Sequence, residues 1–95
     1  MANFVLVCLD KPGALELRLA NREAHFAYLA EHPGVVRLGG PFLDAEGGMA
    51  GSMLIVELAD LAAARGFAAA DPYALAGLFE RVEIRPWRPT VGALP

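Results

Sequence analysis

The sequence predicts an α+β fold, in which helices cover one face of an antiparallel sheet. Two observations lead to this prediction. Four short stretches have the apolar or alternating character of strands, and two other stretches have helical character. They follow one another in the order β-α-β-β-α-β, with an extra short helix before the last strand. At 95 residues, the chain is expected to form a single domain over residues 1–95.

The first half of the chain is predicted to form a strand, a long helix and a second strand. Residues 3–9 are largely apolar and end at a Pro-Gly turn, so they form a strand that is apolar on both faces. Residues 14–32 form a helix that a second Pro-Gly pair ends. Residues 35–40 form a short strand that ends in the Gly-Gly-Pro of residues 39–41. The helix is predicted from apolar side chains at helical spacing, namely Leu15, Leu19, Phe26 and Leu29.

The second half is predicted to form a strand, two helices and a last strand. After a glycine-rich turn, residues 53–58 form an apolar strand. Residues 61–70 form an alanine-rich helix with Asp60 as its N-cap. Asp71 and the proline after it begin a short helix. Residues 80–87 alternate between polar and apolar side chains and form the last strand, after which the tail is irregular.

Composition and patterning predict a homodimer. Hydrophobic residues make up 56% of the sequence, which is more apolar surface than so short a chain easily buries alone. The helices cover one face of the sheet, whereas the first strand is apolar on both faces. The sheet of a second copy is the simplest cover for the other face. The net charge of −3, with Lys11 as the only lysine, argues against nucleic acid as a partner.

Membrane, metal and thiol chemistry are not indicated. No segment has the length of a membrane-spanning helix, and the first residues lack the basic start of a signal peptide. We therefore expect a cytoplasmic protein that does not bind a membrane. Cys8 is the only cysteine, and we expect it to be a buried core residue rather than a nucleophile. Without a metal-binding motif, we expect neither a metal nor another cofactor.

Three polar side chains of the long predicted helix share one face: Arg18, Arg22 and His25. Arg22 interrupts the apolar series, so we expect it at or beside the buried side of the helix, where a guanidinium requires a partner. That partner is an anionic ligand or an acidic side chain such as Glu23 or Asp10. The remaining alternative is a surface arginine whose stem packs on the protein.

Asp71 and Ser52 complete the candidate site around His25. An imidazole changes charge near neutral pH, so His25 is a candidate general acid or base. Asp71 is either an ordinary N-cap or the carboxylate that orients a histidine, and spacing alone does not bring it beside His25. Ser52 follows a glycine, a residue type that allows a ligand to approach the backbone, and its hydroxyl is a candidate hydrogen-bond donor.

A set of short segments occurs in the order that is typical of a known family. The segments are Asp10-Lys11, Arg18, Arg22-Glu23-Ala24-His25, Leu29, Gly39-Gly40-Pro41, Gly51-Ser52, Asp71-Pro72-Tyr73, Gly77-Leu78 and Val82-Glu83-Ile84-Arg85-Pro86-Trp87. In these segments, which span nearly the whole chain, the sequence resembles the YciI-like family. The resemblance implies a ferredoxin-like fold whose sheets pair into a dimeric α/β barrel. It also implies a pocket centred on His25 and Asp71.

The leading hypothesis is a cofactor-independent acid–base enzyme of the lyase, isomerase or dehydrochlorinase type. Its substrate would be a small anionic cyclic or aromatic compound, as the resemblance implies. His25 would move a proton while Asp71 holds the imidazole in one tautomer. Arg18 or Arg22 would neutralise the charge of the substrate, and Ser52 would donate a hydrogen bond. The alternative is a non-catalytic small-molecule-binding or assembly module, because a fold does not fix a function.

Overall fold

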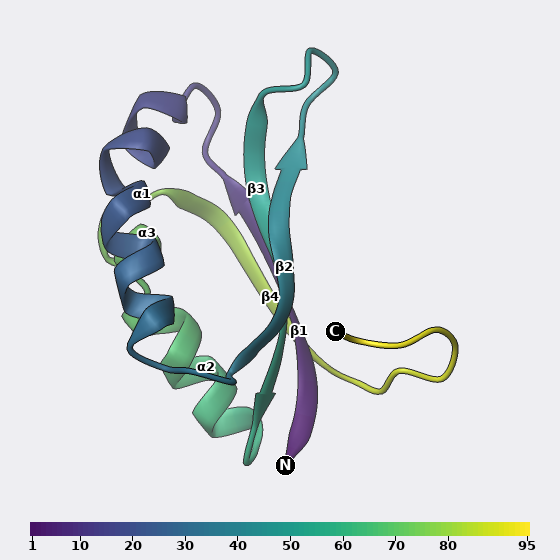
Figure 1. Cartoon of the computed structure of the whole chain (residues 1–95). Helices are drawn as coiled ribbons and strands as arrows, with labels where there is room; N and C mark the ends of the chain where they lie inside the picture. Colours follow the sequence, from purple (N-terminus) through teal and green to yellow (C-terminus); the bar gives the residue numbers. More distant parts are fainter.

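The computed structural model describes residues 1–95 and has two layers, a four-stranded antiparallel sheet and a layer of helices on one of its faces (Figure 1). The strand order is β2-β3-β1-β4, and each neighbouring pair is antiparallel. The predicted α+β fold and its element order are confirmed. The elements are β1 (Ala2–Asp10), α1 (Leu15–Ala30), β2 (Val36–Leu43), β3 (Met49–Leu58), α2 (Leu61–Ala70), α3 (Pro72–Leu75) and β4 (Phe79–Trp87).

Strands β2 and β3 are longer than the sequence predicts. β2 does not end at the Gly-Gly-Pro of residues 39–41 but continues to Leu43, and β3 begins at Met49 rather than at Met53. Pro41 is tolerated inside β2 because β2 is an edge strand of the sheet. The prediction that this proline ends the strand was therefore wrong, and β2 and β3 form one long hairpin.

The apolar core lies between the sheet and α2. Phe4, Leu6 and Cys8 alternate along β1 toward the helices, as the period of a strand requires. Each large apolar side chain that is fully buried contributes roughly 1.5–3 kcal/mol. The prediction that Cys8 is a buried core residue is confirmed. The other members of the core are Leu54 and Val56 of β3 and Ala64, Phe67 and Ala68 of α2.

Helix α1 buries polar residues where the sequence predicted an apolar face. Leu15, Leu19 and Phe26 are exposed, by 44%, 49% and 54%, whereas Arg18 and His25 are only 4% and 5% exposed. The reason is tertiary, because α1 packs mainly against α3 rather than on the centre of the sheet. The buried side of α1 therefore forms one wall of a polar site, and its apolar stripe lies at the edge of that site or in solvent.

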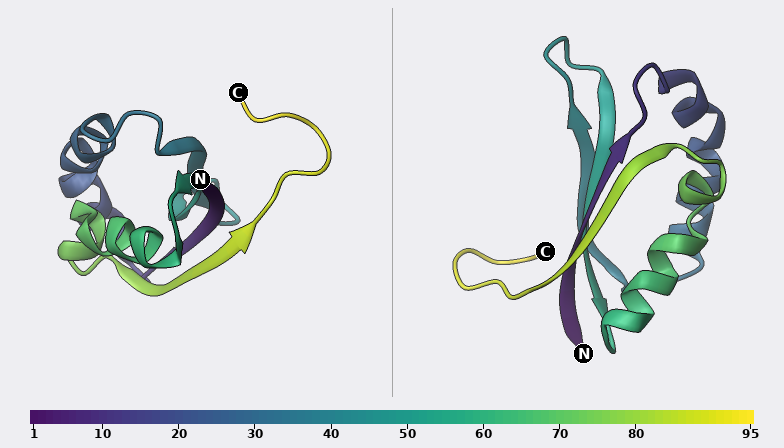
Figure 2. Two further views of the ribbon diagram at one scale, coloured as in Figure 1. Left: turned by 90° about the horizontal axis from the view of Figure 1, so that it is seen from below. Right: turned by 180° about the vertical axis from the view of Figure 1, so that it is seen from behind.

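We call the sheet face opposite the helices the outer face. In the single chain it is crossed only by the C-terminal tail, which leaves β4 on that side of the sheet (Figures 1 and 2). Val5 and Val7 are partly buried there, and Leu9 is 39% exposed. The outer face of β1 is thus apolar, as predicted. None of the helices combines the length and the hydropathy that a membrane span requires.

Candidate functional site

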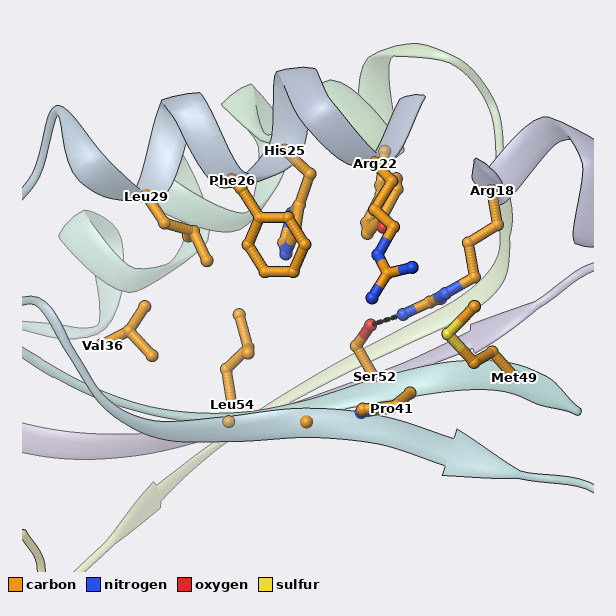
Figure 3. A pocket seen from close by; sticks show the side chains of 13 residues that line it. Arg18, Arg22, His25, Phe26, Leu29, Val36, Pro41, Met49, Ser52 and Leu54 are labelled. Carbon is orange, nitrogen blue, oxygen red and sulfur yellow. Dashed lines mark hydrogen bonds between the residues drawn. The ribbon is translucent and has the colours of Figure 1, made fainter. Parts of the chain in front are cut away.

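A cavity of about 220 Å³ lies between α1 and the β2–β3 hairpin. Figure 3 shows the side chains of α1 projecting from one wall toward the strands on the other. Phe26 and Leu29 make the α1 wall partly apolar, and Val36 and Leu54 do the same for the sheet. The polar groups of the lining are Arg18, Arg22 and His25 of α1 and Ser52 of β3. The cavity therefore combines apolar and polar walls.

Gly51 of the hairpin has a packing reason to be glycine, whereas a Cβ on Gly39, which lines the cavity, would clash only with the movable end of the Leu54 side chain. A Cβ on Gly51 would lie 2.5 Å from the backbone carbonyl oxygen of Cys8. Gly51 thus allows β3 to approach β1 closely. The next residue, Ser52, turns to the helix side of the sheet and reaches the cavity.

His25 and Asp71 form a buried pair. Nδ1 of His25 lies 2.9 Å from both carboxylate oxygens of Asp71, and the two residues are each 5% exposed. A carboxylate only accepts hydrogen bonds, so Nδ1 must donate, which leaves Nε2 of the neutral ring without a proton. Nε2 makes no hydrogen bond within the chain, and His25 lines the cavity. The pair therefore presents a basic nitrogen to a ligand.

Asp71 also caps α3. Its Oδ1 accepts a hydrogen bond from the backbone N–H of Tyr73 at 2.9 Å, and Pro72 occupies the first helical position. The two roles that the sequence left open, helix cap and orienting carboxylate, are both present in one side chain. The cap fixes the carboxylate, and the carboxylate in turn fixes the imidazole.

Tyr73 packs directly on the imidazole of His25. The two rings are stacked, with centroids 4.1 Å apart and an interplanar angle of 15°. The Cζ atom of Arg18 lies 4.8 Å from the centroid of the Tyr73 ring, within the range of a cation–π interaction. Burial raises the pKa of Tyr73 above its ordinary 10.0, although Arg18 and Arg22 act in the opposite direction. Its hydroxyl is therefore neutral near pH 7.

Arg18 joins Asp10 and Ser52 in a second buried cluster. Nη1 of Arg18 donates to the two carboxylate oxygens of Asp10 at 3.1 and 3.0 Å, and Nη2 donates to Oγ of Ser52 at 2.6 Å. Asp10 was one of the acidic partners that the sequence offered for an arginine on this face of the helix. Because Oγ of Ser52 accepts from Arg18, the proton of its own hydroxyl remains available to another acceptor.

Arg22 differs from Arg18 in both burial and pairing. The sequence placed Arg22 at or beside the buried side of the helix, and it lies beside that side: it is exposed but lines the cavity, whereas the buried arginine is Arg18. Arg22 forms no ion pair, and its Cζ lies 5.6 Å from the centroid of the Phe26 ring. Figure 3 shows its guanidinium directed into the cavity, toward Ser52. Arg22 is thus a cation at the cavity whose charge no acidic side chain neutralises.

Cys8 lies behind this site and has the chemistry of a core thiol. Burial, assisted by the negative charges of Asp71 and Asp10, raises its pKa from 9.0 to about 12. A thiol with so high a pKa is protonated near pH 7 and is a poor nucleophile. No group of three or more histidine, cysteine or acidic side chains is arranged to hold a metal ion.

Each residue that the sequence singled out lines the cavity or contacts a residue that does. His25, Arg18, Arg22 and Ser52 line it directly, and Asp71 lies behind His25. Sequence reasoning did not assign Tyr73 to the site, and it named Asp10 only as one partner for an arginine. The position of Tyr73, two residues after a capping aspartate, was a signal that could have identified it.

Comparison with known proteins gives a family and a related enzyme. A family model for the YCII-related domain matches residues 2–88. The protein YciI of Escherichia coli O6:H1 is 36% identical over 93 residues, covering 90% of this chain and 95% of that protein. An uncharacterized protein of Haemophilus influenzae is 37% identical over 93 residues, with the same coverage.

A solved structure with a named activity is also similar. It is that of the 5-chloro-2-hydroxyhydroquinone dehydrochlorinase TftG from Burkholderia phenoliruptrix AC1100, in complex with 2,5-dihydroxybenzoquinone. The sequence identity is 34% and the TM-score is 0.85, covering 90% of this chain and 93% of that chain. The likeness therefore extends over most of the fold.

Proposed function

The chain belongs to the YCII-related domain family, and we propose that it is an enzyme that acts on a small molecule by acid–base catalysis at His25. The observation that carries this proposal is the buried His25–Asp71 pair at the cavity. A carboxylate that binds Nδ1 holds the imidazole in the tautomer whose Nε2 accepts a proton, and it stabilises the imidazolium that forms. The similarity to a dehydrochlorinase supports an enzyme rather than a structural module.

In the proposed reaction, Nε2 of His25 takes a proton from the substrate. The electron pair of the broken bond then forms a new double bond within the substrate. In an elimination it expels a leaving group such as chloride, and the imidazolium afterwards releases its proton to water. In an isomerisation the pair shifts along the substrate, and Nε2 returns the same proton to a second atom. Both reactions balance with no other reactant.

The charges around the cavity favour an anionic substrate. The charge of Arg18 is neutralised by Asp10, so its role is to hold Ser52 in place. Arg22 forms no ion pair and is directed into the cavity, so it supplies the positive charge that the substrate meets. Of the two arginines that the sequence offered, we therefore assign Arg22 to the substrate and Arg18 to positioning.

The size of the cavity favours a single ring. Its volume of about 220 Å³ is below the roughly 300–1,000 Å³ that is common for drug-sized ligands. The apolar walls formed by Phe26 and Leu54 suit the faces of a planar ring. TftG, which is similar over nearly the whole chain, binds such a ring, 2,5-dihydroxybenzoquinone. We propose a small anionic cyclic or aromatic substrate, without assigning it the substrate of TftG.

The proposal is tested by elimination from chlorinated hydroxylated rings. The purified protein is incubated with 5-chloro-2-hydroxyhydroquinone and related chlorophenols, and the release of chloride is measured. We expect release that His25→Gln reduces by about 100-fold or more, because general acid–base catalysis contributes typically 10²–10⁴-fold. His32→Gln is the matched control and should keep the wild-type rate. Binding of these rings without His25-dependent turnover would favour the alternative, a non-catalytic binding module.

We also propose that the protein is a homodimer that forms through the outer face. Val5 and Val7 of β1, which are only partly buried, create an apolar strip there that no helix covers. Leu9, at 39% exposure, and Trp87, at 39%, extend the strip toward its ends. Packing the outer faces of two copies would remove this apolar surface from water, in the manner of two aligned sheets.

A further inference from the structure

The hydroxyl of Tyr73 is a polar group that no part of the chain satisfies. Tyr73 is only 2% exposed, yet its hydroxyl makes no hydrogen bond within the chain. Tyr28 provides a contrast, because its hydroxyl donates to the carbonyl oxygen of Phe67 at 2.9 Å. The hydroxyl oxygen is not among the buried polar atoms that lack a partner, so it is accessible at the cavity that Tyr73 lines. A tyrosine whose ring is buried usually directs its hydroxyl to a hydrogen-bond partner. The hydroxyl of Tyr73 is therefore free to bond a ligand in the cavity.

The ring of Tyr73 is fixed at the cavity. The backbone N–H of Tyr73 donates a hydrogen bond to Asp71. The ring stacks on the imidazole of His25, with the two centroids 4.1 Å apart. The guanidinium of Arg18 lies 4.8 Å from the ring centroid. Tyr73 also lines the cavity. A ligand that occupies the cavity beside His25 is thus the partner available to the hydroxyl, whose ring has little freedom to turn elsewhere.

The hydroxyl is suited to donate rather than to accept. Its pKa is raised by burial, so it keeps its proton at neutral pH. A neutral phenol that donates to a negatively charged oxygen forms one of the stronger hydrogen bonds in proteins. Ser52 offers a second proton of the same kind, because its oxygen already accepts from Arg18. The cavity therefore contains two neutral donors next to one basic nitrogen.

We propose that Tyr73 is a further catalytic residue, whose hydroxyl donates a hydrogen bond to an anionic oxygen on the ring of the substrate while His25 exchanges the proton. This inference rests on the proposed function and adds the chemical class of the ligand, a ring that bears an ionised hydroxyl or enol oxygen. Donors placed where negative charge develops stabilise the transition state more than the ground state. Tyr73 and Ser52 together would form such a site.

The test uses Tyr73→Phe, which removes the hydroxyl but keeps the ring stacked on His25. The probe is 2,5-dihydroxybenzoquinone, a planar ring with two acidic enol groups, and its Kd is measured by titration calorimetry on the intact protein. We expect the Kd to rise about 10- to 100-fold, the loss typical of a hydrogen bond to a charged group. The melting temperature and the ¹⁵N shifts of His25 should stay at their wild-type values.

Tyr28→Phe is the matched control, because it removes a tyrosine hydroxyl outside the cavity and should leave the Kd unchanged. Equal Kd values for Tyr73→Phe and the wild type would overturn the inference, as would equal weakening by the two variants. Failure of the wild type to bind the probe at millimolar concentration would overturn the assigned ligand class. The proposed function fails by a different result, the retention of turnover in His25→Gln, so the two failures are distinguishable.

Discussion

The carboxylate of Asp71 serves two neighbours at once, the imidazole of His25 and the first turn of α3. Few residue types do both, since a cap requires a short side chain with an acceptor and the imidazole requires a carboxylate. Asparagine caps a helix about as well as aspartate but carries no charge. Replacement of this one side chain by asparagine thus separates the role in folding from the role at the site.

We predict that Asp71→Asn preserves the fold and changes His25. The melting temperature should stay within a few degrees of the wild type, because α3 remains capped. The ¹⁵N shifts of His25 should show a different tautomer balance, and turnover should fall by roughly 10²–10⁴-fold, as when a triad loses its carboxylate. His32, which is not in contact with Asp71, is the internal reference. Unchanged shifts at both histidines would mean that Asp71 is only a cap.

The buried pair of Arg18 and Asp10 predicts a second residue-level result. The two side chains are each 5% exposed, so loss of one partner leaves the other charge unpaired in the interior. We expect Asp10→Asn to lower the free energy of unfolding by about 3–5 kcal/mol, and the double variant Asp10→Asn, Arg18→Met to recover part of that loss. Denaturant unfolding of the variants measures both effects.

The surface pair of Arg37 and Glu57 is the matched control for that experiment. Both side chains are 34% exposed, so solvent screens the interaction. Glu57→Gln should therefore cost no more than about 1 kcal/mol. If Asp10→Asn lowers the free energy of unfolding as little as Glu57→Gln does, then removal of Asp10 does not leave an unpaired buried charge on Arg18. That result would contradict the burial of this ion pair.

At the scale of elements, β1 has different environments on its two faces. Its helix-side residues form the core, and Cys8 lies among them beside the polar site. The raised pKa of this thiol has a consequence for stability. The native state keeps the proton that the unfolded chain releases at about its ordinary pKa of 9.0, so the stability due to this group is complete below that pH. It is lost progressively as the pH rises toward about 12.

We predict that the free energy of unfolding falls above about pH 9, by up to about 1.4 kcal/mol per pH unit from Cys8. Tyr73, whose pKa is also raised, adds to the fall above its ordinary 10.0. Cys8→Ala should be less stable at pH 8 because it leaves a cavity, but its stability should decline less steeply with pH. Denaturant unfolding at a series of pH values measures the slopes, and equal slopes would show that Cys8 is not the cause.

Helix α1 shows how an element can be assigned correctly while its buried face is not. Its position and approximate length were predictable from apolar spacing and from the Pro-Gly pair after it, although it ends at Ala30 rather than at residue 32. The prediction of its buried face was wrong because periodicity identifies an apolar stripe but does not show what packs against it. In this fold α1 lies beside α3 and over a cavity, so the polar stripe of Arg18 and His25 turns inward.

At the scale of the whole molecule, the outer face of the sheet predicts an assembly. Val7 projects there, opposite Met53 of β3 and Glu83 of β4. We expect a dimer mass at micromolar concentration in sedimentation equilibrium, and Val7→Asp should shift the mass toward the monomer, since burial of a lone carboxylate is costly. Leu75→Asp, at a position of α3 on the helix side of the sheet that is 75% exposed, is the control and should remain dimeric. A monomer mass for the wild type would contradict the prediction.

The sequence alone determined the fold class, the order of the elements and the family, because these follow from local patterns and from segments in a fixed order. Period-two and helical spacing, prolines, glycines and caps are local signals, and each strand and helix was found from them. The exact ends of β2 and β3 were not found, since whether Pro41 ends a strand depends on its place at the edge of the sheet.

Only the tertiary structure decided how the site residues are used. His25 and Asp71 are 46 positions apart, and Arg18 and Ser52 are 34 apart, so no local pattern predicts their hydrogen bonds. The fold alone buries Arg18 beside Asp10, leaves Arg22 unpaired and stacks Tyr73 on His25. The physical reason is that pairing, burial and charge compensation depend on which distant segments the packing brings together, whereas the sequence fixes only which side chains are available.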